Sequence, residues 1–239
     1  MFMAYRRILA VGDIHGNYQK FLTLWDQLVF DPTQDLIVFL GDYTDRGKES
    51  RQVMEWVMAH FGTEHMVFLR GNHDEMMLAA LLDVERDLWL QNGGGATVKS
   101  LRGMDDLEAF LKRWAKTIQK MPLYLEVEQG GQTYWFMHAG LKPGVPLAEQ
   151  EPETLLWDRD FAMADRYDGT EVVTVGHTPV PYLAYDSGEK LGNRPLLRDG
   201  GRRILLDTGG FLAGGRISAI DVLTKRIWQS DPMPELGGW

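Results

Sequence analysis

The segment Leu36-Ile-Val-Phe-Leu-Gly-Asp-Tyr-Thr-Asp-Arg-Gly47 is the part of this 239-residue chain that indicates its architecture most clearly. It starts as a continuous apolar run, typical of a strand that is buried on both faces of a parallel sheet, and it ends in a polar turn. Two segments repeat this pattern, because Ile8-Leu-Ala-Val11 continues into Gly12-Asp-Ile-His-Gly16, and Met66-Val-Phe-Leu69 continues into Arg70-Gly-Asn-His-Asp74. The pattern predicts three strands that each end in polar residues.

Amphipathic helices are predicted between these runs, at about 21–29 and 50–61, and a third helix follows to Leu82. Strands and helices that alternate in this way indicate successive βαβ units and a parallel sheet. Right-handed crossovers place the carboxyl ends of such strands on one edge, where open α/β sheets bind ligands. Three distant pieces of sequence are therefore expected to converge on one site.

The second half of the chain changes to short strands separated by glycine-rich turns, predicted at 123–127, 133–137, 171–175, 203–206 and 216–220. Two of them again end in polar clusters, at His138-Ala-Gly-Leu141 and Gly176-His-Thr178. We expect an α/β fold in which two sheets, one from each half of the chain, pack as a sandwich with the site at a shared edge. The whole chain, 1–239, is interpreted as one domain. Residues 83–120 are interpreted as a helical, cap-like insertion, because the segment is too short for a core of its own.

Charge and cysteine content exclude several classes of function. The 25 Lys and Arg against 34 Asp and Glu give a net charge of −9. This balance argues against nucleic acid as a partner and gives no attraction to anionic membranes. No signal peptide and no 18-residue apolar span are found, so a cytoplasmic location is expected. The absence of cysteine excludes disulfides, thiolate metal sites and a cysteinyl-phosphate intermediate.

The strand-end residues form a set of metal-ligand types: two carboxylates, one amide and three imidazoles, at Asp13, His15, Asp42, Asn72, His138 and His177. One divalent ion rarely needs six such side chains, whereas two ions that share a bridging carboxylate use them naturally. Asp42, in the central motif, is the expected bridge. Two such ions hold a hydroxide between them for attack on a phosphate ester.

Each residue also has a simpler interpretation on its own. A Gly-Asp pair after a strand is usually a turn, Asn72 suits the N-cap of a helix, and an isolated histidine is usually structural. Five strand ends that deliver His, Asp or Asn to one edge are hard to assign to turns alone.

Three further residues in these motifs are expected to take part in catalysis rather than in metal binding. His73 is expected to act as a general acid, because imidazole titrates near neutral pH. Asp45 is expected to fix its tautomer, and Arg46 offers a planar fork for phosphate. Arg159 is a second candidate phosphate ligand. The alternatives are an ordinary ion pair for Arg46 and a loop arginine packed on Trp157 for Arg159.

Five ordered motifs carry a resemblance that extends from about residue 7 to 222: Gly12-Asp-Ile-His-Gly16, Gly41-Asp-Tyr-Thr-Asp-Arg-Gly47, Gly71-Asn-His-Asp74, His138-Ala-Gly-Leu141 and Gly176-His-Thr178. Together they resemble the motifs of the phosphoprotein phosphatase family of calcineurin-like metallophosphoesterases, in particular the serine/threonine phosphatases of bacterial and bacteriophage-lambda type.

The resemblance implies an αββα-type sandwich with a dimetal site at the strand ends. One metal would be held by Asp13, His15 and Asp42, and the other by Asp42, Asn72, His138 and His177. The metals implied are manganese, or iron and zinc. His73, paired with Asp45, would be the acid, and Arg46 with Arg159 would bind the phosphate, without a covalent phosphoenzyme.

Two departures bear on the substrate. Asp74 stands where protein phosphatases more often carry glutamate and where diadenosine tetraphosphate hydrolases often carry aspartate, whereas Asp45 is retained here and is typically lost in those hydrolases. The tyrosine-containing loop of eukaryotic members is not found, and Asp207-Thr-Gly-Gly210 occupies that region.

The retained Asp45 favours a phosphomonoester hydrolase acting on phosphorylated proteins, peptides or small phosphoesters. Hydrolysis of dinucleoside polyphosphates is the alternative within the same family. A metal-binding protein without turnover and a nucleic-acid phosphodiesterase are less favoured. The sequence does not determine the oligomeric state or whether 83–120 closes over the site.

Overall fold

Parallel strands and their crossover helices form the first half of the molecule. The computed structural model describes residues 4–183 and 191–232. In it, β1 (Arg7–Val11), β2 (Asp35–Phe39) and β3 (Met66–Phe68) pair in parallel. The predicted helices are present as α1 (Tyr18–Leu28) and α2 (Ser50–His60). The carboxyl ends of the three strands therefore meet at one edge, as predicted.

The first sheet is completed from the far end of the chain. Its order is β10-β9-β1-β2-β3, with β9 (Ser218–Asp221) antiparallel to β1 and β10 (Ile227–Gln229) outside it. The prediction of one sheet from each half is therefore wrong in this detail. Strand β1 has a second edge, and pairing it with β9 satisfies backbone groups that would otherwise be exposed.

The second sheet has the order β4-β5-β6-β8-β7. Strands β4 (Tyr124–Gln129) and β5 (Gln132–Met137) form a hairpin, β6 (Val172–Val175) and β8 (Arg203–Leu205) continue the sheet in parallel, and β7 (Leu196–Arg198) is an antiparallel edge. Strands β5 and β6 end immediately before His138 and Gly176-His177, so two more polar motifs reach the same edge.

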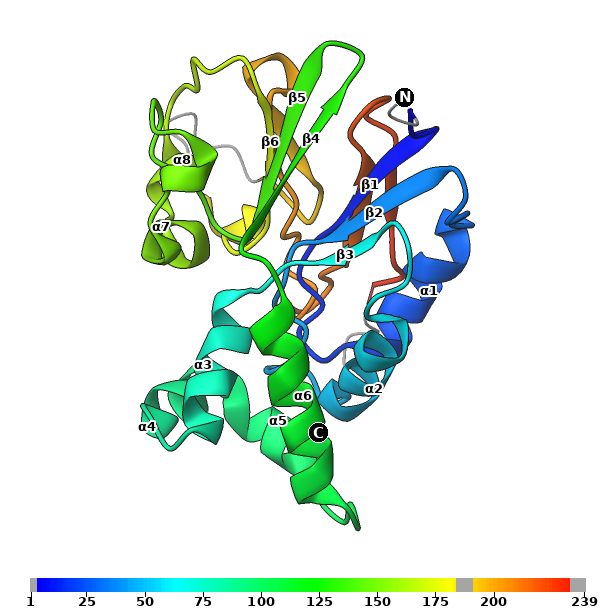
Figure 1. The fold of residues 1–239 in the computed structure, drawn as a ribbon, viewed down its shortest axis with the longest axis vertical. Helices are drawn as coiled ribbons and strands as arrows, with labels where there is room; N and C mark the ends of the chain where they lie inside the picture. The colour runs from blue at the N-terminus through cyan, green and yellow to red at the C-terminus, as the bar shows by residue number, and fades with distance from the viewer. Residues whose placement is uncertain (1–3, 184–190, 233–239) are drawn as a thin grey trace.

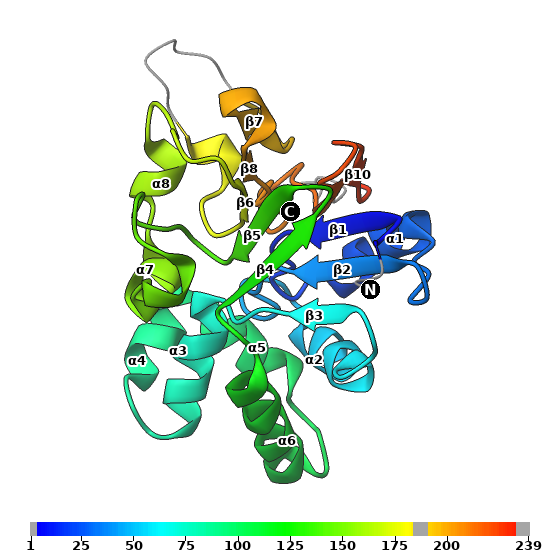
Figure 2. The ribbon, with the colours of Figure 1, turned by 45° about the horizontal axis from the view of Figure 1, so that its top comes forward.

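Alternating side chains along the strands produce the layers. Ile8 and Ala10 of β1 point into a core between the two sheets, whereas Leu9 and Val11 pack toward α1 and α2. On the outer side of the second sheet, Val173 packs in a third core with α7 (Pro152–Trp157) and α8 (Asp160–Met163). Figures 1 and 2 show the resulting order of helices, sheet, sheet and helices. The predicted two-sheet αββα-type α/β sandwich is confirmed.

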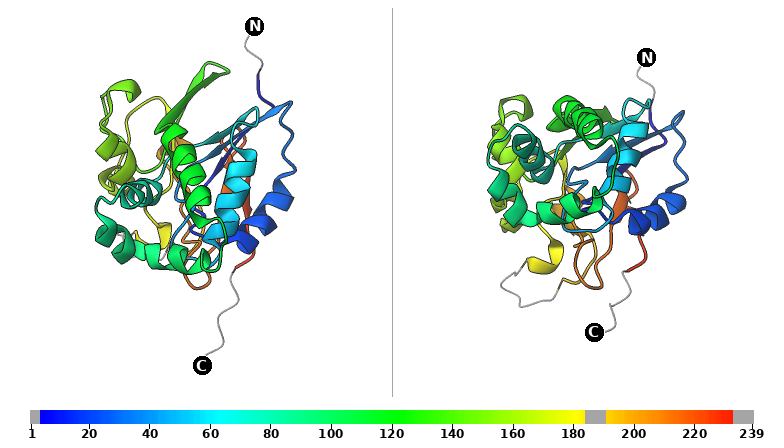
Figure 3. Two further views of the ribbon diagram at one scale, coloured as in Figure 1. Left: turned by 60° about the horizontal axis from the view of Figure 1, so that its bottom comes forward. Right: turned by 90° about the horizontal axis from the view of Figure 1, so that it is seen from below.

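Residues 83–120 contain several helices and pack beside α3 (Asn72–Leu81). They form α4 (Arg86–Trp89), an irregular turn of π-helical type at Leu90–Gly94, α5 (Gly95–Ser100) and α6 (Leu107–Lys120). Buried Trp114 of α6 belongs to the same core as Tyr43 and Phe68. These helices gather at one end of the molecule, cyan to green in Figure 3.

Short 3-10 turns lie at Leu147–Glu149, Val180–Tyr182 and Asp199–Gly201. Within the described ranges, no helix combines the length and apolarity needed to cross a membrane.

Candidate active site

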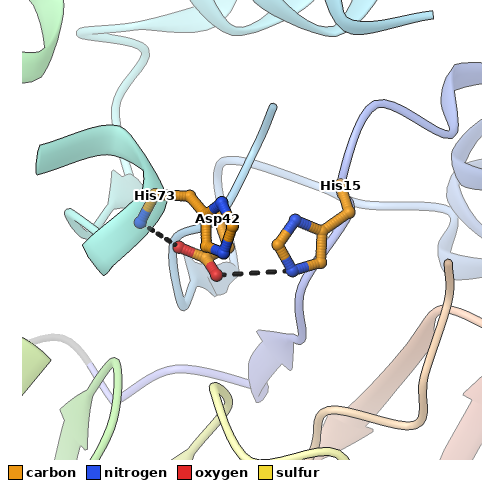
Figure 4. Close-up of side chains that lie close together, drawn as sticks. All are labelled: His15, Asp42 and His73. Carbon is orange, nitrogen blue, oxygen red and sulfur yellow. Dashed lines mark hydrogen bonds and ion pairs between the residues drawn. The ribbon is translucent and has the colours of Figure 1, made fainter. Parts of the chain in front are cut away.

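Asp42 lies at the centre of the predicted ligands. Its Oδ2 is 3.4 Å from Nε2 of His15, and its Oδ1 is 3.4 Å from Nε2 of His138. Oδ2 of Asp13 is 4.0 Å from the same atom of His15. Figure 4 shows the Asp42 carboxylate beside His15 and His73. Asp42, which is predicted to bridge two ions, thus lies between the imidazoles of His15 and His138.

Asn72 joins the remaining two histidines to the site. Its Oδ1 lies 2.9 Å from Nε2 of His138 and 3.1 Å from Nδ1 of His177. Gly71 occupies the N-cap position of α3 and Asn72 is the first helical residue, so the interpretation of Asn72 as an N-cap is wrong. The structure therefore brings all six predicted ligands together, and all six are buried.

Hydrogen bonds from the outer side orient two of the imidazoles. Nδ1 of His15 donates to the carbonyl oxygen of Thr44 at 2.9 Å, and Nδ1 of His138 donates to that of Leu40 at 2.8 Å. Each bond leaves Nε2 facing Asp42, and such outer partners are typical of metal-binding histidines. In the described part of the chain, buried Nε2 of His177 has no hydrogen-bond partner.

The buried carboxylates show why the site suits cations. Burial raises the pKa of Asp13 well above its usual value, and the nearby charges of Asp207 and Asp42 raise it further. Burial would also raise the pKa of Asp42, but His138 and the other adjacent imidazoles lower it. Two clusters of potential ligand atoms, each within 4.8 Å of one another, share Asp42: His15, Asp42 and His73, and Asp13, Asp42 and His138. Carboxylate and imidazole ligands that share one aspartate fit a pair of divalent ions.

Several site residues adopt left-handed backbone conformations, which are uncommon for residues other than glycine. The φ values are 47° for His15, 55° for Asp42, 72° for Asp45, 64° for Arg46 and 62° for His177. Such conformations persist only where the surrounding structure imposes them, and they often mark functional sites.

Gly71 allows the second and third motifs to touch. A Cβ atom at this position would lie 2.2 Å from Oδ1 of Asp42 and 2.4 Å from its backbone nitrogen. No side chain fits there, so the glycine is required by the close approach to the central aspartate.

Asp74 has a structural role in the same turn. Its Oδ2 accepts hydrogen bonds from the backbone N–H groups of Gly71 and Asp42, both at 2.9 Å, and its Oδ1 accepts one from Tyr43 at 3.3 Å. Because the carboxylate faces backbone donors, the choice of aspartate or glutamate here says little about the substrate.

His73 and Asp45 form the predicted pair. Nδ1 of His73 donates to Oδ2 of Asp45 at 2.8 Å, and both side chains are buried. The guanidinium of Arg46 donates to Nε2 of His73 at 2.9 Å and to Nε2 of His15 at 3.0 Å, and it lies 4.2 Å from the centre of the Phe211 ring. Among the described residues no carboxylate pairs with Arg46, so the ion-pair alternative is not observed.

A hollow of about 420 Å³ opens in front of this group. Arg159 is exposed at its rim, where it shares the hollow with Arg46 and His177. The full lining is Arg46, Gln91, Asn92, Gly93, Arg159, His177, Pro179, Tyr182 and Phe211.

Sequence reasoning missed four residues at the site. Asp207 lies just after β8, as the predicted ligands lie just after their strands, so the strand-end pattern could have identified it as a site residue. Phe211 lies beside Arg46 and, edge-on, beside His15. Trp89 and Thr97 contact Asp45, and no pattern in the sequence marks them.

Comparison with known proteins agrees with this geometry. The family model described as "Calcineurin-like phosphoesterase" matches residues 6–211. The chain belongs to the calcineurin-like phosphoesterase family. This family membership confirms the resemblance of the five motifs and the expectation of a metal-dependent phosphoric ester hydrolase.

Relatives of this phosphoesterase fall into more than one substrate class. It is 31% identical to serine/threonine-protein phosphatase 2 of Escherichia coli (strain K12) over 88% of this chain and 90% of that protein. It is 28% identical to bis(5′-nucleosyl)-tetraphosphatase PrpE of Geobacillus sp. (strain WCH70), over 73% and 79%. A solved protein serine/threonine phosphatase from Saccharomyces cerevisiae shares the fold, with a TM-score of 0.58 at 14% identity, over 98% of this chain and 82% of that one.

Proposed function

We propose that this phosphoesterase is a dimetal-dependent phosphomonoester hydrolase that acts on phosphoserine or phosphothreonine in proteins and peptides. The observation that supports it is the His73–Asp45 pair, held 2.8 Å apart next to the central Asp42. A leaving alkoxide needs a proton, and a histidine fixed by a carboxylate can supply it.

Asp13, His15 and Asp42 would hold one ion, and Asp42, Asn72, His138 and His177 the other. When bound, two divalent ions neutralise phosphoryl charge and lower the pKa of water, which provides the nucleophile. Manganese as the metal, and the cytoplasm as the location, stay predictions.

The chain's own residues perform the remaining steps. Arg46 and Arg159, which share the hollow, would bind the nonbridging phosphate oxygens and orient the phosphorus for attack in line with the leaving group. Arg46 must then exchange part of its contact with His15 and His73 for the phosphate. Once Arg46 has moved to the phosphate, His73 in its doubly protonated form would donate the Nε2 proton to the departing oxygen while Asp45 holds Nδ1, and the products are an alcohol and inorganic phosphate.

Replacing His73, the proposed acid, and replacing Asp42, the proposed central ligand, should affect activity and metal content differently. His73→Asn should lower kcat by roughly 10²- to 10⁴-fold, because general acid catalysis contributes about that much, while metal content stays at the wild-type level. Asp42→Asn should lose metal as well as activity, as elemental analysis of the two purified variants would show. Full activity in either variant contradicts the assignment.

Dinucleoside polyphosphate hydrolysis is the second candidate. Two arginines lie in the hollow together with the aromatic rings of Tyr182 and Phe211, which could stack on a nucleobase. A panel that compares diadenosine tetraphosphate with a phosphoserine peptide at equal concentration separates the two candidates. We expect higher kcat/KM for the peptide, and a strong preference for the dinucleotide would reverse the choice. If the metal-loaded protein hydrolyses neither substrate, nor a nucleic-acid phosphodiester, a binding role without turnover replaces both candidates.

A further inference from the structure

We propose that Trp89 and Thr97 are positioning residues that hold Asp45 and, through it, aim His73. Both come from the helical segment 83–120, far in sequence from the five motifs. The indole Nε1–H of Trp89 donates to both carboxylate oxygens of Asp45 at 3.0 Å, and the hydroxyl of Thr97 donates to Oδ1 at 2.7 Å. The proposal rests on the role of His73 as the general acid.

The contacts around Asp45 determine its orientation. Its carboxylate is fully buried and accepts from three side chains: His73, Trp89 and Thr97. Its backbone N–H lies 3.0 Å from Oγ1 of Thr97 and 3.2 Å from Oγ of Ser50. Thr97 therefore contacts both the backbone and the carboxylate of Asp45, and the indole N–H contacts both carboxylate oxygens.

This arrangement matters because Asp45 holds Nδ1 of His73, while Nε2, which contacts Arg46 in the structure, is the nitrogen that would face the leaving group. If the carboxylate turns, Nε2 moves with it. A misplacement of about 1 Å in a reacting group can lower a rate by about 100-fold. Removing Trp89 or Thr97 leaves the buried carboxylate with fewer hydrogen bonds to fix its plane, which makes such a turn easier.

The rest of the segment 89–100 also contacts the motif that contains Asp45. The carbonyl oxygen of Gly93 accepts the backbone N–H of Arg46 at 3.2 Å. A Cβ on Gly94 would lie 2.5 Å from the Trp89 ring, so the glycine leaves room for the indole. The backbone N–H of Arg51 donates to Oγ of Ser100 at 3.2 Å. The segment 89–100 therefore forms a wall of the site, beyond the cap-like role predicted for it.

Substrates with different leaving groups test the proposal. Trp89→Phe keeps an aromatic ring but removes the indole N–H, and Thr97→Val keeps the shape of the side chain but removes the hydroxyl. We expect kcat on a phosphoserine peptide, whose alkoxide must be protonated, to fall roughly 10- to 100-fold. On p-nitrophenyl phosphate, whose leaving group needs no proton, kcat should stay within about 3-fold. KM and metal content should be unchanged, and Thr97→Ser, which keeps the hydroxyl, should retain both rates.

Matched controls and a double variant complete the design. Trp114→Phe and Thr117→Val make the same exchanges on α6, away from Asp45, and should leave the ratio of the two rates at its wild-type value. In an Asp45→Asn background, Trp89→Phe should cause no further loss if it acts through Asp45.

Three outcomes overturn the proposal. Equal losses on both substrates would mean a structural role for Trp89 and Thr97, and full additivity with Asp45→Asn would mean that they act elsewhere. If His73→Asn itself does not discriminate between the substrates, the acid role fails and the inference fails with it. If His73→Asn discriminates but the two new variants do not, only the inference fails.

Discussion

Asp207 is a buried acid with an incomplete set of partners. Its Oδ1 accepts the backbone N–H of Gly209 at 2.9 Å, and its Oδ2 has no partner among the described residues. Burial raises its pKa to about 6, although the Gly209 N–H and Arg46 act in the opposite direction. The fold therefore favours the protonated form of this side chain when no metal is bound.

This shift predicts a pH effect on the metal-free protein. A carboxyl group whose folded pKa is raised stabilises the fold at low pH, and that contribution is lost as the pH rises from about 4, the unfolded value, through about 6. Asp207→Asn cannot ionise, so it should unfold with a free energy about 1–3 kcal/mol higher than wild type at pH 7.5 and nearly equal at pH 4. Urea titrations of the chelator-treated proteins at both pH values measure this, and an unchanged difference contradicts it.

For single residues, sequence reasoning found the candidate ligands because parallel strands end at one edge. Asp13, His15 and Asp42 needed only that rule, and the structure places them together. Thr97 could not be found in this way, because it lies on a helix within a segment that has no motif, and its contact with Asp45 depends on how α5 packs against α2. The catalytic roles of His73, Asp45, Arg46 and Arg159 stay predictions.

Among the elements, α6 packs the segment 83–120 into the main hydrophobic core. Trp114 is fully buried in the core that also contains Tyr43, whose ring meets it edge-on at 6.3 Å. Tyr43 lies directly after Asp42. The helix is thus packed on the motif that carries the central ligand.

Shortening Trp114 should destabilise the whole molecule. Trp114→Ala is expected to lower the free energy of unfolding by about 3–5 kcal/mol through the lost burial and the cavity, and to do so in a single transition seen by both fluorescence and circular dichroism. Leu107→Ala, on the same helix but 37% exposed, should cost less than about 1 kcal/mol. Two separate transitions, with only the first one affected, would instead make 83–120 an independent unit and contradict a single domain.

Short elements were the ones that sequence patterns missed. Strands β7 and β10 have three residues each at the edges of their sheets, too few for a period of two to be visible. Gly93 and Gly94 lie in the irregular turn at Leu90–Gly94 and allow close contact with Arg46 and Trp89, which no sequence pattern indicated.

For the whole molecule, four buried aspartates that lie close together should make the free energy of folding depend on bound metal ions. Asp13, Asp42, Asp74 and Asp207 are all at most 2% exposed, and their mutual repulsion opposes folding when cations are absent.

Metal should therefore stabilise the protein against unfolding. At a free metal concentration about 100 times the dissociation constant, stabilisation of about 2.7 kcal/mol is expected from binding to the folded state alone. Thermal unfolding with manganese and after chelation measures it, and Asp42→Asn should show little response. Equal midpoints in both conditions for a catalytically active wild type would contradict dimetal binding at this site.

The return of β9 to β1 has a consequence for synthesis of the protein. These paired strands lie about two hundred residues apart in the chain, which a ribosome needs about 10 to 40 s to cover at ~5–20 residues per second. During that interval the nascent β1 has an unpaired edge and its apolar side chains lack a partner sheet. During the same interval the polar residues of the first three motifs lack part of their site, because His138 and His177 are synthesised after them. The free edge of β1 is therefore covered only after β9 has been synthesised, and the six candidate ligands can come together only after His177 has been made.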